Sequence, residues 1–129
     1  MKFFKSKKGG LVDGLLATCP TSPNCVVSET HARSAQAIDP ISFSQLPADA
    51  WNIIQDSIRQ TGGSIQSVDD EYLHATYTSK VMRYVDDVEL RLDSNSQQIH
   101  MRSVSRVGYS DMGANRKRME RVRKAFNGQ

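Results

Sequence analysis

The spacing of hydrophobic residues changes twice along the chain and divides it into elements. Apolar residues recur at helical spacing from Ala50 to Ile58, which predicts a helix over about residues 47–61. Pro47 suits its first turn, and Gly62 follows its end. The apolar side of this helix should pack against a sheet.

From residue 64 the period changes to two, which is typical of strands. Four strands are predicted, at Ile65, Tyr72–Ser79, Tyr84–Leu92 and Gln98–Val107. Their connections are short and therefore favour an antiparallel meander. After Gly108 the helical spacing returns, with Ser110 or Asp111 as candidate caps.

These elements predict an α+β fold. It has a four-stranded antiparallel sheet, with one helix before it and one after it packed on one face. Residues 18–47 contain all four prolines and should be irregular. We expect a flexible basic N-terminal tail at residues 1–15 and a single α+β domain at residues 16–127.

The charge is divided unevenly. The formal net charge is +3, but residues 1–10 contribute +4 and residues 111–129 also +4, so residues 11–110 carry −5. An acidic body argues against a nucleic-acid groove on the sheet.

The N-terminus does not form a convincing export signal, because Asp13 and two glycines interrupt a short apolar run. No segment has the roughly 18 consecutive apolar residues of a transmembrane helix. The sequence therefore predicts a soluble, cytoplasmic protein.

Alternation places charged residues on one face of the last two strands. Asp87 and Glu89 lie on the third strand, and His100, Arg102 and Arg106 on the fourth. A two-residue turn would place Glu89 opposite His100, whereas a four-residue turn would place it opposite Arg102. Both registers bring carboxylates to guanidinium groups.

Two interpretations of this charged face are open. The first is a set of cross-strand ion pairs, each contributing about 0.2–1 kcal/mol. The second is a polar pocket beneath residues 18–47. The candidate ligand-binding or partner-binding residues are His74, Asp87, Glu89, His100, Arg102, Arg106, Asn115 and Arg116.

Asp86 alternates onto the core side, where an unpaired carboxylate is costly. We expect a structural role for it, with Arg116 from the loop at residues 108–116 as its partner.

Cys19 and Cys25 flank a loop that contains two prolines, so they are structural candidates for a disulfide, although a reducing cytosol would keep them as thiols. With His31 and either His74 or His100 they form a weaker metal-site alternative, because the spacing is not typical of zinc. We therefore predict no metal, no cofactor and no catalytic residue.

The last predicted helix is strongly cationic, with Arg116, Lys117, Arg118, Arg121, Arg123 and Lys124. A solvated helix face explains these charges, and binding to an anionic surface or nucleic acid is the alternative.

Several segments together carry a resemblance to a known family. They are Cys19–Val26, Tyr72–Ala75, Val85–Glu89, Arg102–Asp111 and Asn115–Glu120. The region from about Leu16 to Phe126 resembles the DUF1499 family, a domain of unknown function found in bacteria and photosynthetic eukaryotes. The resemblance implies that the cysteine loop, the acidic strand and the arginine strand belong to one constellation, and it brings no reaction, substrate or cofactor. Many members look exported or membrane-attached, whereas this chain has no convincing signal, so the redox state of its cysteines stays open.

The leading hypothesis is a small non-enzymatic binding or accessory domain. Its charged sheet face and the loop at residues 108–116 would engage a protein partner or a small anionic ligand. The alternative is a small enzyme that uses His74, Asp87 or Glu89 in a pocket beneath residues 18–47.

Overall fold

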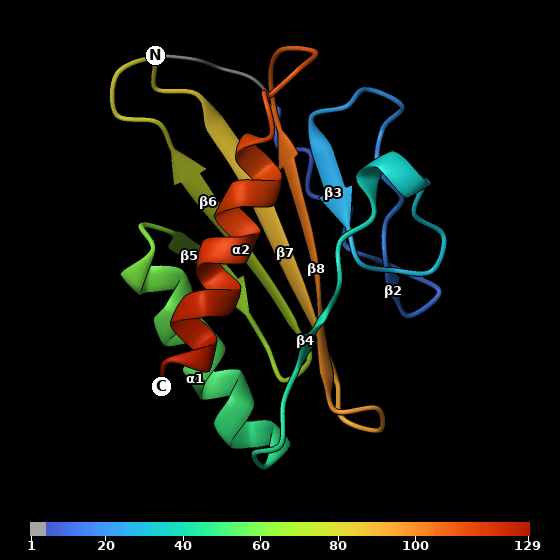
Figure 1. Ribbon diagram of the computed structural model, residues 1–129, viewed down its shortest axis with the longest axis vertical. Helices are drawn as coiled ribbons and strands as arrows, with labels where there is room; N and C mark the ends of the chain where they lie inside the picture. The colour runs from blue at the N-terminus through green and yellow to red at the C-terminus, as the bar shows by residue number, and fades with distance from the viewer. Residues whose placement is uncertain (1–4) are drawn as a thin grey trace.

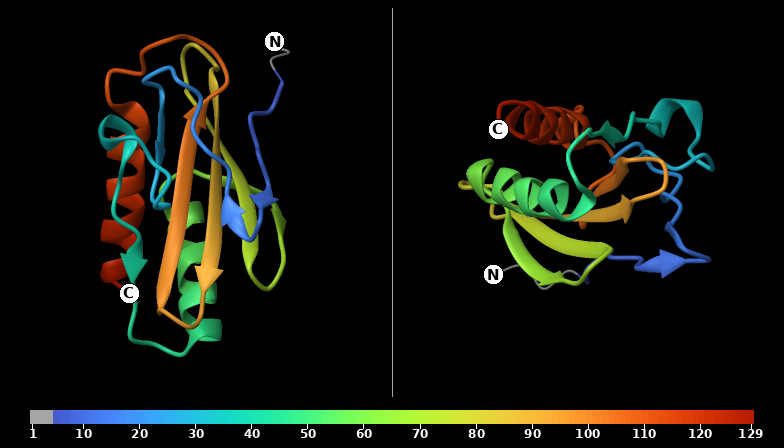
Figure 2. Two further views of the ribbon diagram at one scale, coloured as in Figure 1. Left: turned by 90° about the vertical axis from the view of Figure 1, so that its right-hand side faces the viewer. Right: turned by 90° about the horizontal axis from the view of Figure 1, so that it is seen from below.

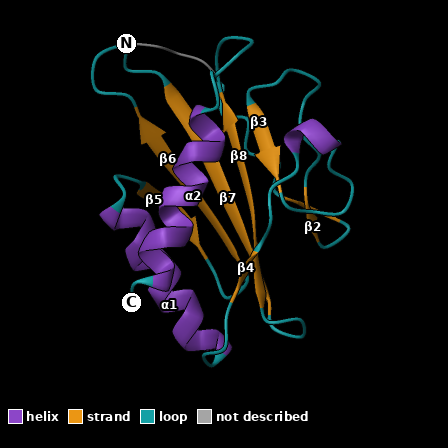
Figure 3. Cartoon of the chain, in the orientation of Figure 1, coloured by secondary structure: helices purple, strands orange, loops and turns teal. Residues whose placement is uncertain are grey.

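The computed structural model describes residues 5–129, and within this range an antiparallel sheet carries two helices on one face (Figure 1). The strands of the main sheet are β3 (Cys25–Val27), β4 (Ile41–Ser42), β5 (Ser64–Val68), β6 (Tyr72–Thr78), β7 (Val85–Asp93) and β8 (Gln98–Ser105). The helices are α1 (Pro47–Gln60) and α2 (Ala114–Asn127), and a 3-10 turn covers Ser34–Gln36. Two further short strands, β1 (Leu11–Val12) and β2 (Leu15–Leu16), form a separate hairpin (Figure 3).

The α+β class and the antiparallel sheet are confirmed, but the predicted number of strands is wrong. In the described residues the main sheet has six strands, in the order β3-β8-β7-β6-β5, with β4 also paired to β8. The two additional strands come from the proline-rich segment, which has too few alternating residues to predict a strand. Both pair with the outer edge of β8 and so cover most of it.

The register between β7 and β8 is the one that a four-residue turn produces. Glu89 lies opposite Arg102, and Arg91 lies opposite His100. Because side chains alternate between faces, this register places Leu90 and Met101 toward the helices and the charged residues on the opposite face.

The helix α1 begins where its sequence predicts and ends one residue before the predicted limit. Pro47 occupies its first turn, and the chain leaves the helix through Gly62, whose φ is +100°. Gly63 also needs to be glycine, because a Cβ there would lie 2.6 Å from Cγ2 of Ile58 and 2.8 Å from Cζ of Tyr77.

The core lies between the helices and the sheet, and α2 lies in front of β6 and β7 (Figure 1). Its fully buried side chains include Ile54 and Ile58 of α1, Leu90 and Met101 of the sheet, and Met119 of α2. The indole of Trp51 is also buried, and its Nε1 donates a hydrogen bond to the backbone oxygen of Asp69 at 2.8 Å.

The N-terminal segment lies against the sheet face that is opposite to the helices (Figure 2). Residues 5–15 were predicted as part of a flexible tail, yet in this structure the backbone of Lys7 and Gly10 is hydrogen-bonded to side chains of β7. Residues 1–4 of the predicted tail lie outside the described residues. The division into a tail and a domain from residue 16 stays a prediction.

Candidate functional site

The charged face of the sheet is built by three neighbouring strands. Strand β6 carries His74, β7 carries Asp87 and Glu89, and β8 carries Arg102. Arg106 follows β8 directly, and its guanidinium reaches back to Asp87. All of these side chains except that of Arg106 are at least nine-tenths buried, so the face is not an open polar surface.

Asp87 accepts hydrogen bonds from several directions. Nε2 of His74 lies 2.8 Å from its carboxylate, Arg106 contacts both carboxylate oxygens at 2.9 Å, and the backbone N–H of Lys7 donates at 2.8 Å. Burial alone would raise the pKa of Asp87, but these donors outweigh burial and hold the pKa well below its ordinary value. Asp87 is therefore a carboxylate at neutral pH.

Glu89 and Arg102 form the second part of this face. The carboxylate of Glu89 is fully buried and lies 3.4 Å from Nη1 of Arg102. It also accepts hydrogen bonds from the hydroxyl of Tyr72 at 2.8 Å and from the backbone N–H of Gly10 at 3.0 Å. Burial and the neighbouring Glu89 raise the pKa of Tyr72 far above its ordinary value, so this hydroxyl stays protonated and donates.

The cover over this face differs from the one that the sequence predicts. Residues 6–18 lie on Asp87, Glu89 and Arg102, and Arg102 donates to the backbone oxygens of Lys7 at 2.9 Å and Thr18 at 3.1 Å. Of the proline-rich segment, Thr18 takes part in this cover, and Ser28 and Glu29 contact His100 at its border. The proline-rich segment also adds β3 and β4 to the sheet. The pattern of the basic tail does not predict this contact, because most of its hydrogen bonds use backbone atoms of the tail.

The last candidate of the charged face, His100, belongs to a neighbouring cluster. Its Nδ1 lies 2.9 Å from the hydroxyl of Ser28 and 3.4 Å from Glu29, whose carboxylate also forms two hydrogen bonds with Arg91. Burial lowers the pKa of His100 and, together with the positive charge of Arg91, outweighs the opposite effect of Glu29. Burial would raise the pKa of Glu29, but the donors around it lower that pKa overall.

These pKa shifts predict how stability depends on pH. We expect the free energy of unfolding to fall in two stages on acidification from pH 7.5. The first begins near pH 6.5, because the unfolded chain protonates its histidine near this value, whereas folding lowers the pKa of His100. The second begins near pH 4, because the folded protein resists protonation of Asp87 and Glu29.

Urea denaturation at a series of pH values measures both stages. In the variant His100→Gln the first stage should become shallower while the second is unchanged. A wild-type protein whose stability rose between pH 6.5 and pH 5 would contradict the assignment to His100.

Asp86 forms an ion pair with an arginine of α2, but this arginine is Arg118 and not the predicted Arg116. Nη2 of Arg118, from the second turn of α2, lies 2.7 Å from Asp86. Arg116 points to the other side of the helix and donates to the backbone oxygens of Ala35 and Ala37. On a helix these two arginines are two positions apart, so they face in different directions.

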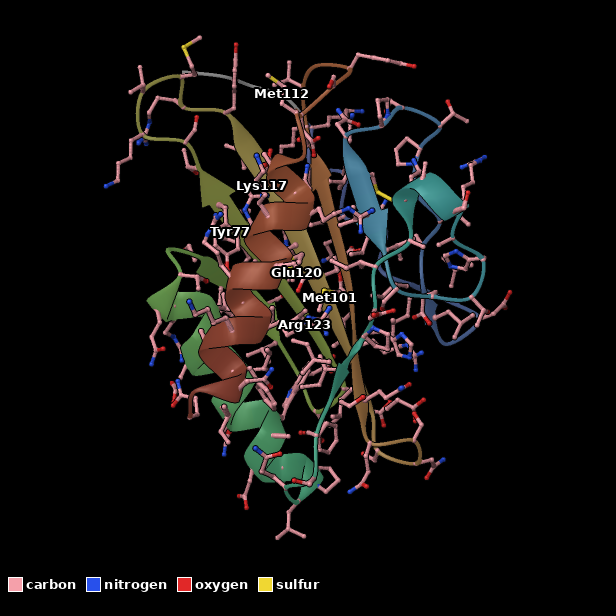
Figure 4. All side chains as sticks on the ribbon, in the orientation of Figure 1. Tyr77, Met101, Met112, Lys117, Glu120 and Arg123 are labelled. Carbon is pink, nitrogen blue, oxygen red and sulfur yellow. A yellow bond between two sulfur atoms is a disulfide. The ribbon has the colours of Figure 1, made fainter. Side chains whose placement is uncertain are left out.

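The other cations of α2 also differ in what they contact. Arg123 donates to the backbone oxygens of Asp39 and Pro40, so this arginine, like Arg116, fixes the proline-rich segment to the helix. Lys117 and Lys124 remain exposed to solvent. Figure 4 shows Lys117, Glu120 and Arg123 along α2, with Met112 at the end of the molecule where this helix begins.

The candidate Asn115 is a buried junction between four segments. Its amide nitrogen donates to Ser105 at 2.9 Å, to Asp111 at 2.7 Å and to the backbone oxygen of Asn24 at 3.2 Å. Its amide oxygen accepts from Ser103 at 2.5 Å and from Arg118 at 2.9 Å. Asn115 therefore holds the loop that leads into α2 against β8 and the cysteine loop.

A pocket of about 450 Å³ opens beside this junction, between the turn after β6 and the loop before α2. Its polar lining includes the Asp86–Arg118 pair and Ser105, and Tyr84 and Met112 lie at its border. The full lining is Ser79, Tyr84, Asp86, Ser105, Val107, Gly108, Ser110, Asp111, Met112, Ala114 and Arg118. Sequence reasoning identified the loop but missed Arg118, because the cationic run on α2 conceals which arginine faces the sheet.

Cys19 and Cys25 form a disulfide, so neither is a thiolate in this structure (Figure 4). His31 is directed to the backbone oxygen of Leu16, with Nε2 at 2.8 Å. Within residues 5–129 there is no group of three or more His, Cys, Asp or Glu side chains arranged to hold a metal ion. The sulfur atoms of Cys19 and Cys25, which the alternative metal site would use as thiolate ligands, are bonded to each other.

Among the described residues no helix is both long enough and apolar enough to cross a membrane.

Comparison with known proteins identifies the family. Residues 15–126 match the model of a family described as a protein of unknown function, DUF1499, which confirms the resemblance found in the sequence. Comparisons with curated proteins and with solved structures gave no significant match.

Proposed function

We propose that this chain, which belongs to the DUF1499 family, is a small binding domain whose ligand site is the pocket between the turn after β6 and the loop before α2. The observation that carries this proposal is the Asp86–Arg118 pair, which lines an open pocket next to exposed apolar side chains. Buried polar groups that border an apolar wall are typical of ligand pockets.

The charges of the pocket favour a neutral ligand that carries hydroxyl groups. Arg118 offsets the charge of Asp86 at 2.7 Å, and three N–H groups of Gly113 and Asn115 donate to Asp111. An added full charge of either sign would therefore meet a like charge nearby. A hydroxyl can instead donate to Asp86 and accept from a serine.

The apolar part of such a ligand would lie against the pocket border. Met112 is 88% exposed and Tyr84 is 38% exposed, and both line the pocket together with Val107. Covering a side chain of this kind contributes about 25 cal/mol for each Å² of apolar surface removed from water. This combination supports a ligand with a hydroxyl-rich head and a short apolar body.

The charged sheet face supports direct binding of a small ligand less well. Asp87 is paired with His74 and Arg106, and Glu89 is paired with Arg102. Residues 6–18 cover these side chains. We therefore retain the predicted loop at residues 108–116 and replace the sheet face by the pocket as the small-ligand site.

Three probes with the same alkyl chain and different heads test this proposal: hexyl glucoside, hexylammonium and hexanoate. We expect saturable backbone amide shift changes at residues 79–84 and 105–114 in NMR spectra, with hexyl glucoside as the tightest ligand. In the variant Asp86→Asn its dissociation constant should rise by about tenfold or more, because a hydrogen bond to a charged acceptor contributes about 1.5–3 kcal/mol.

The matched control is Asp56→Asn, on the exposed side of α1, which should leave binding unchanged. The proposal is wrong if none of the probes shifts the pocket residues, or if hexanoate binds most tightly.

The Cys19–Cys25 disulfide is relevant to location. Disulfides persist mainly in oxidising compartments, whereas cytosolic thiols are kept reduced. The disulfide therefore favours an oxidising environment, and the cytoplasmic location expected from the sequence stays a prediction.

A further inference from the structure

The segment at residues 5–10 covers the charged face almost entirely through its backbone. The N–H of Lys7 donates to Asp87 at 2.8 Å, and the N–H of Gly10 donates to Glu89 at 3.0 Å. The carbonyl of Lys7 accepts from Arg102 at 2.9 Å. One side chain joins them, since the hydroxyl of Ser6 donates to Asp87 at 3.0 Å.

Such a set of contacts recognises chiefly the main chain of the segment. Buried carboxylates accept from two backbone N–H groups that are three residues apart, and a buried guanidinium donates to the carbonyl between them. An extended peptide offers the same groups, because every residue except proline has one backbone donor and one acceptor. The end of the segment adds a steric demand: a Cβ on Gly9 would lie 2.4 Å from Cβ of Ala17, and Gly10 has a φ of +67°, so glycine suits both positions.

Little apolar burial holds the segment in place. Residues 5, 6, 8 and 9 are exposed, and residues 7 and 10 are only partly buried. The lysine side chains add one ring contact, in which Nζ of Lys8 lies 5.9 Å from the centre of the Tyr72 ring. When the segment leaves, water can replace its hydrogen bonds, so exchange with another chain costs little.

The receiving face is more firmly held than the segment. His74 and Arg106 hold Asp87 in position, and Tyr72 together with Arg102 holds Glu89. These donors come from the sheet or from the end of β8, so the acceptors keep their orientation in the absence of residues 5–10. A site that is fixed before its ligand arrives loses less entropy on binding.

We propose that the charged face formed by Asp87, Glu89 and Arg102 is a peptide-binding site for an extended segment of a partner protein, and that residues 5–10 are its intramolecular occupant. This site is separate from the pocket of the proposed function, which lies around Asp86 and the start of α2. The ligand class is an extended peptide backbone with small or polar side chains, like those of the occupant itself.

A labelled peptide with the sequence of residues 1–12 tests the proposal by fluorescence anisotropy. The full-length variant Lys7→Pro/Gly10→Pro removes both N–H donors of the occupant and should release it. We expect this variant to bind the peptide at least about tenfold more tightly than the wild-type chain, in which the occupant competes.

Two control peptides separate backbone recognition from charge attraction. A peptide with proline at positions 7 and 10 keeps most of the charge but lacks both donors. Its affinity should be at least about tenfold lower. A peptide with alanine at position 7 loses a lysine but keeps the donor, so its affinity should change by less than about threefold. Equal binding of the proline peptide would overturn the proposal.

A second measurement needs no variant. Excess unlabelled peptide should accelerate amide hydrogen exchange at residues 6–10 of the wild-type chain, because the added peptide displaces them. Unchanged exchange at saturating peptide would overturn the proposal. The variant Asp86→Asn should bind hexyl glucoside more weakly but leave peptide binding unchanged, so the two sites can fail independently.

Discussion

Replacing Arg102 by alanine is expected to lower the free energy of unfolding by about 3–5 kcal/mol, which corresponds to roughly 10–20 °C in the melting temperature. The side chain of Arg102 is 5% exposed, and its partner Glu89 is fully buried. Without Arg102 the carboxylate of Glu89 keeps the N–H of Gly10 and the hydroxyl of Tyr72 but loses its positive neighbour. A buried carboxylate without a countercharge is the main cost.

The variant also removes contacts to the N-terminal segment. Arg102 donates to the backbone oxygens of Lys7 and Thr18, so Arg102→Ala should increase hydrogen exchange in residues 6–18 as well. Urea denaturation measures the loss of stability, and hydrogen–deuterium exchange mass spectrometry measures the exchange in residues 6–18.

Two further variants separate the causes. Arg121→Ala, on the exposed surface of α2, should cost less than about 0.5 kcal/mol. The double variant Glu89→Gln/Arg102→Met removes both charges and should be more stable than Arg102→Ala, because neither charge is left alone. If Arg102→Ala were as stable as Arg121→Ala, the buried ion pair would not have the role assigned to it.

Replacing Asn115 by alanine is expected to cost about 3 kcal/mol. Five hydrogen bonds are lost, and the buried backbone oxygen of Asn24 and the hydroxyl of Ser103 each lose a partner. An unsatisfied buried polar group costs about 1–3 kcal/mol, and water that enters from the adjacent pocket should limit the total. The shift of the urea midpoint measures this cost.

The control for Asn115→Ala is Asn127→Ala in the last turn of the same helix, where the side chain is exposed. Asn115→Ala should also increase the mobility of residues 108–113, because Asn115 connects Asp111 to β8. A measured cost below about 1 kcal/mol would show that the loop is held by other contacts.

Local pattern was sufficient to predict most of the fold. The observed helix α1 ends one residue before the predicted limit, and β6, β7 and β8 lie within one or two residues of the predicted strands. Each of these elements is long enough to show the spacing of its apolar residues, and this spacing differs clearly between a helix and a strand. The short strands β3 and β4 could not be predicted, because a strand of two or three residues has no measurable period and depends on its neighbour for pairing.

The candidate site was predicted in part. The sequence placed Asp87, Glu89 and Arg102 on one face, and the structure brings them together there. It could not predict the cover, because Lys7 and Gly10 bind through backbone groups that every residue shares. The partner of Asp86 was misassigned because α2 carries several arginines, and the sequence does not show which of them faces Asp86.

By itself, therefore, the sequence determined the family, the helices, the long strands and the side of the sheet that carries charge, because these follow from periodicity and side-chain identity. Only the tertiary structure decided that this charge is buried, that residues 6–18 cover it, and that Arg118 meets Asp86 beside a pocket. Such contacts depend on long-range packing and on backbone atoms, and neither leaves a periodic signal in the chain.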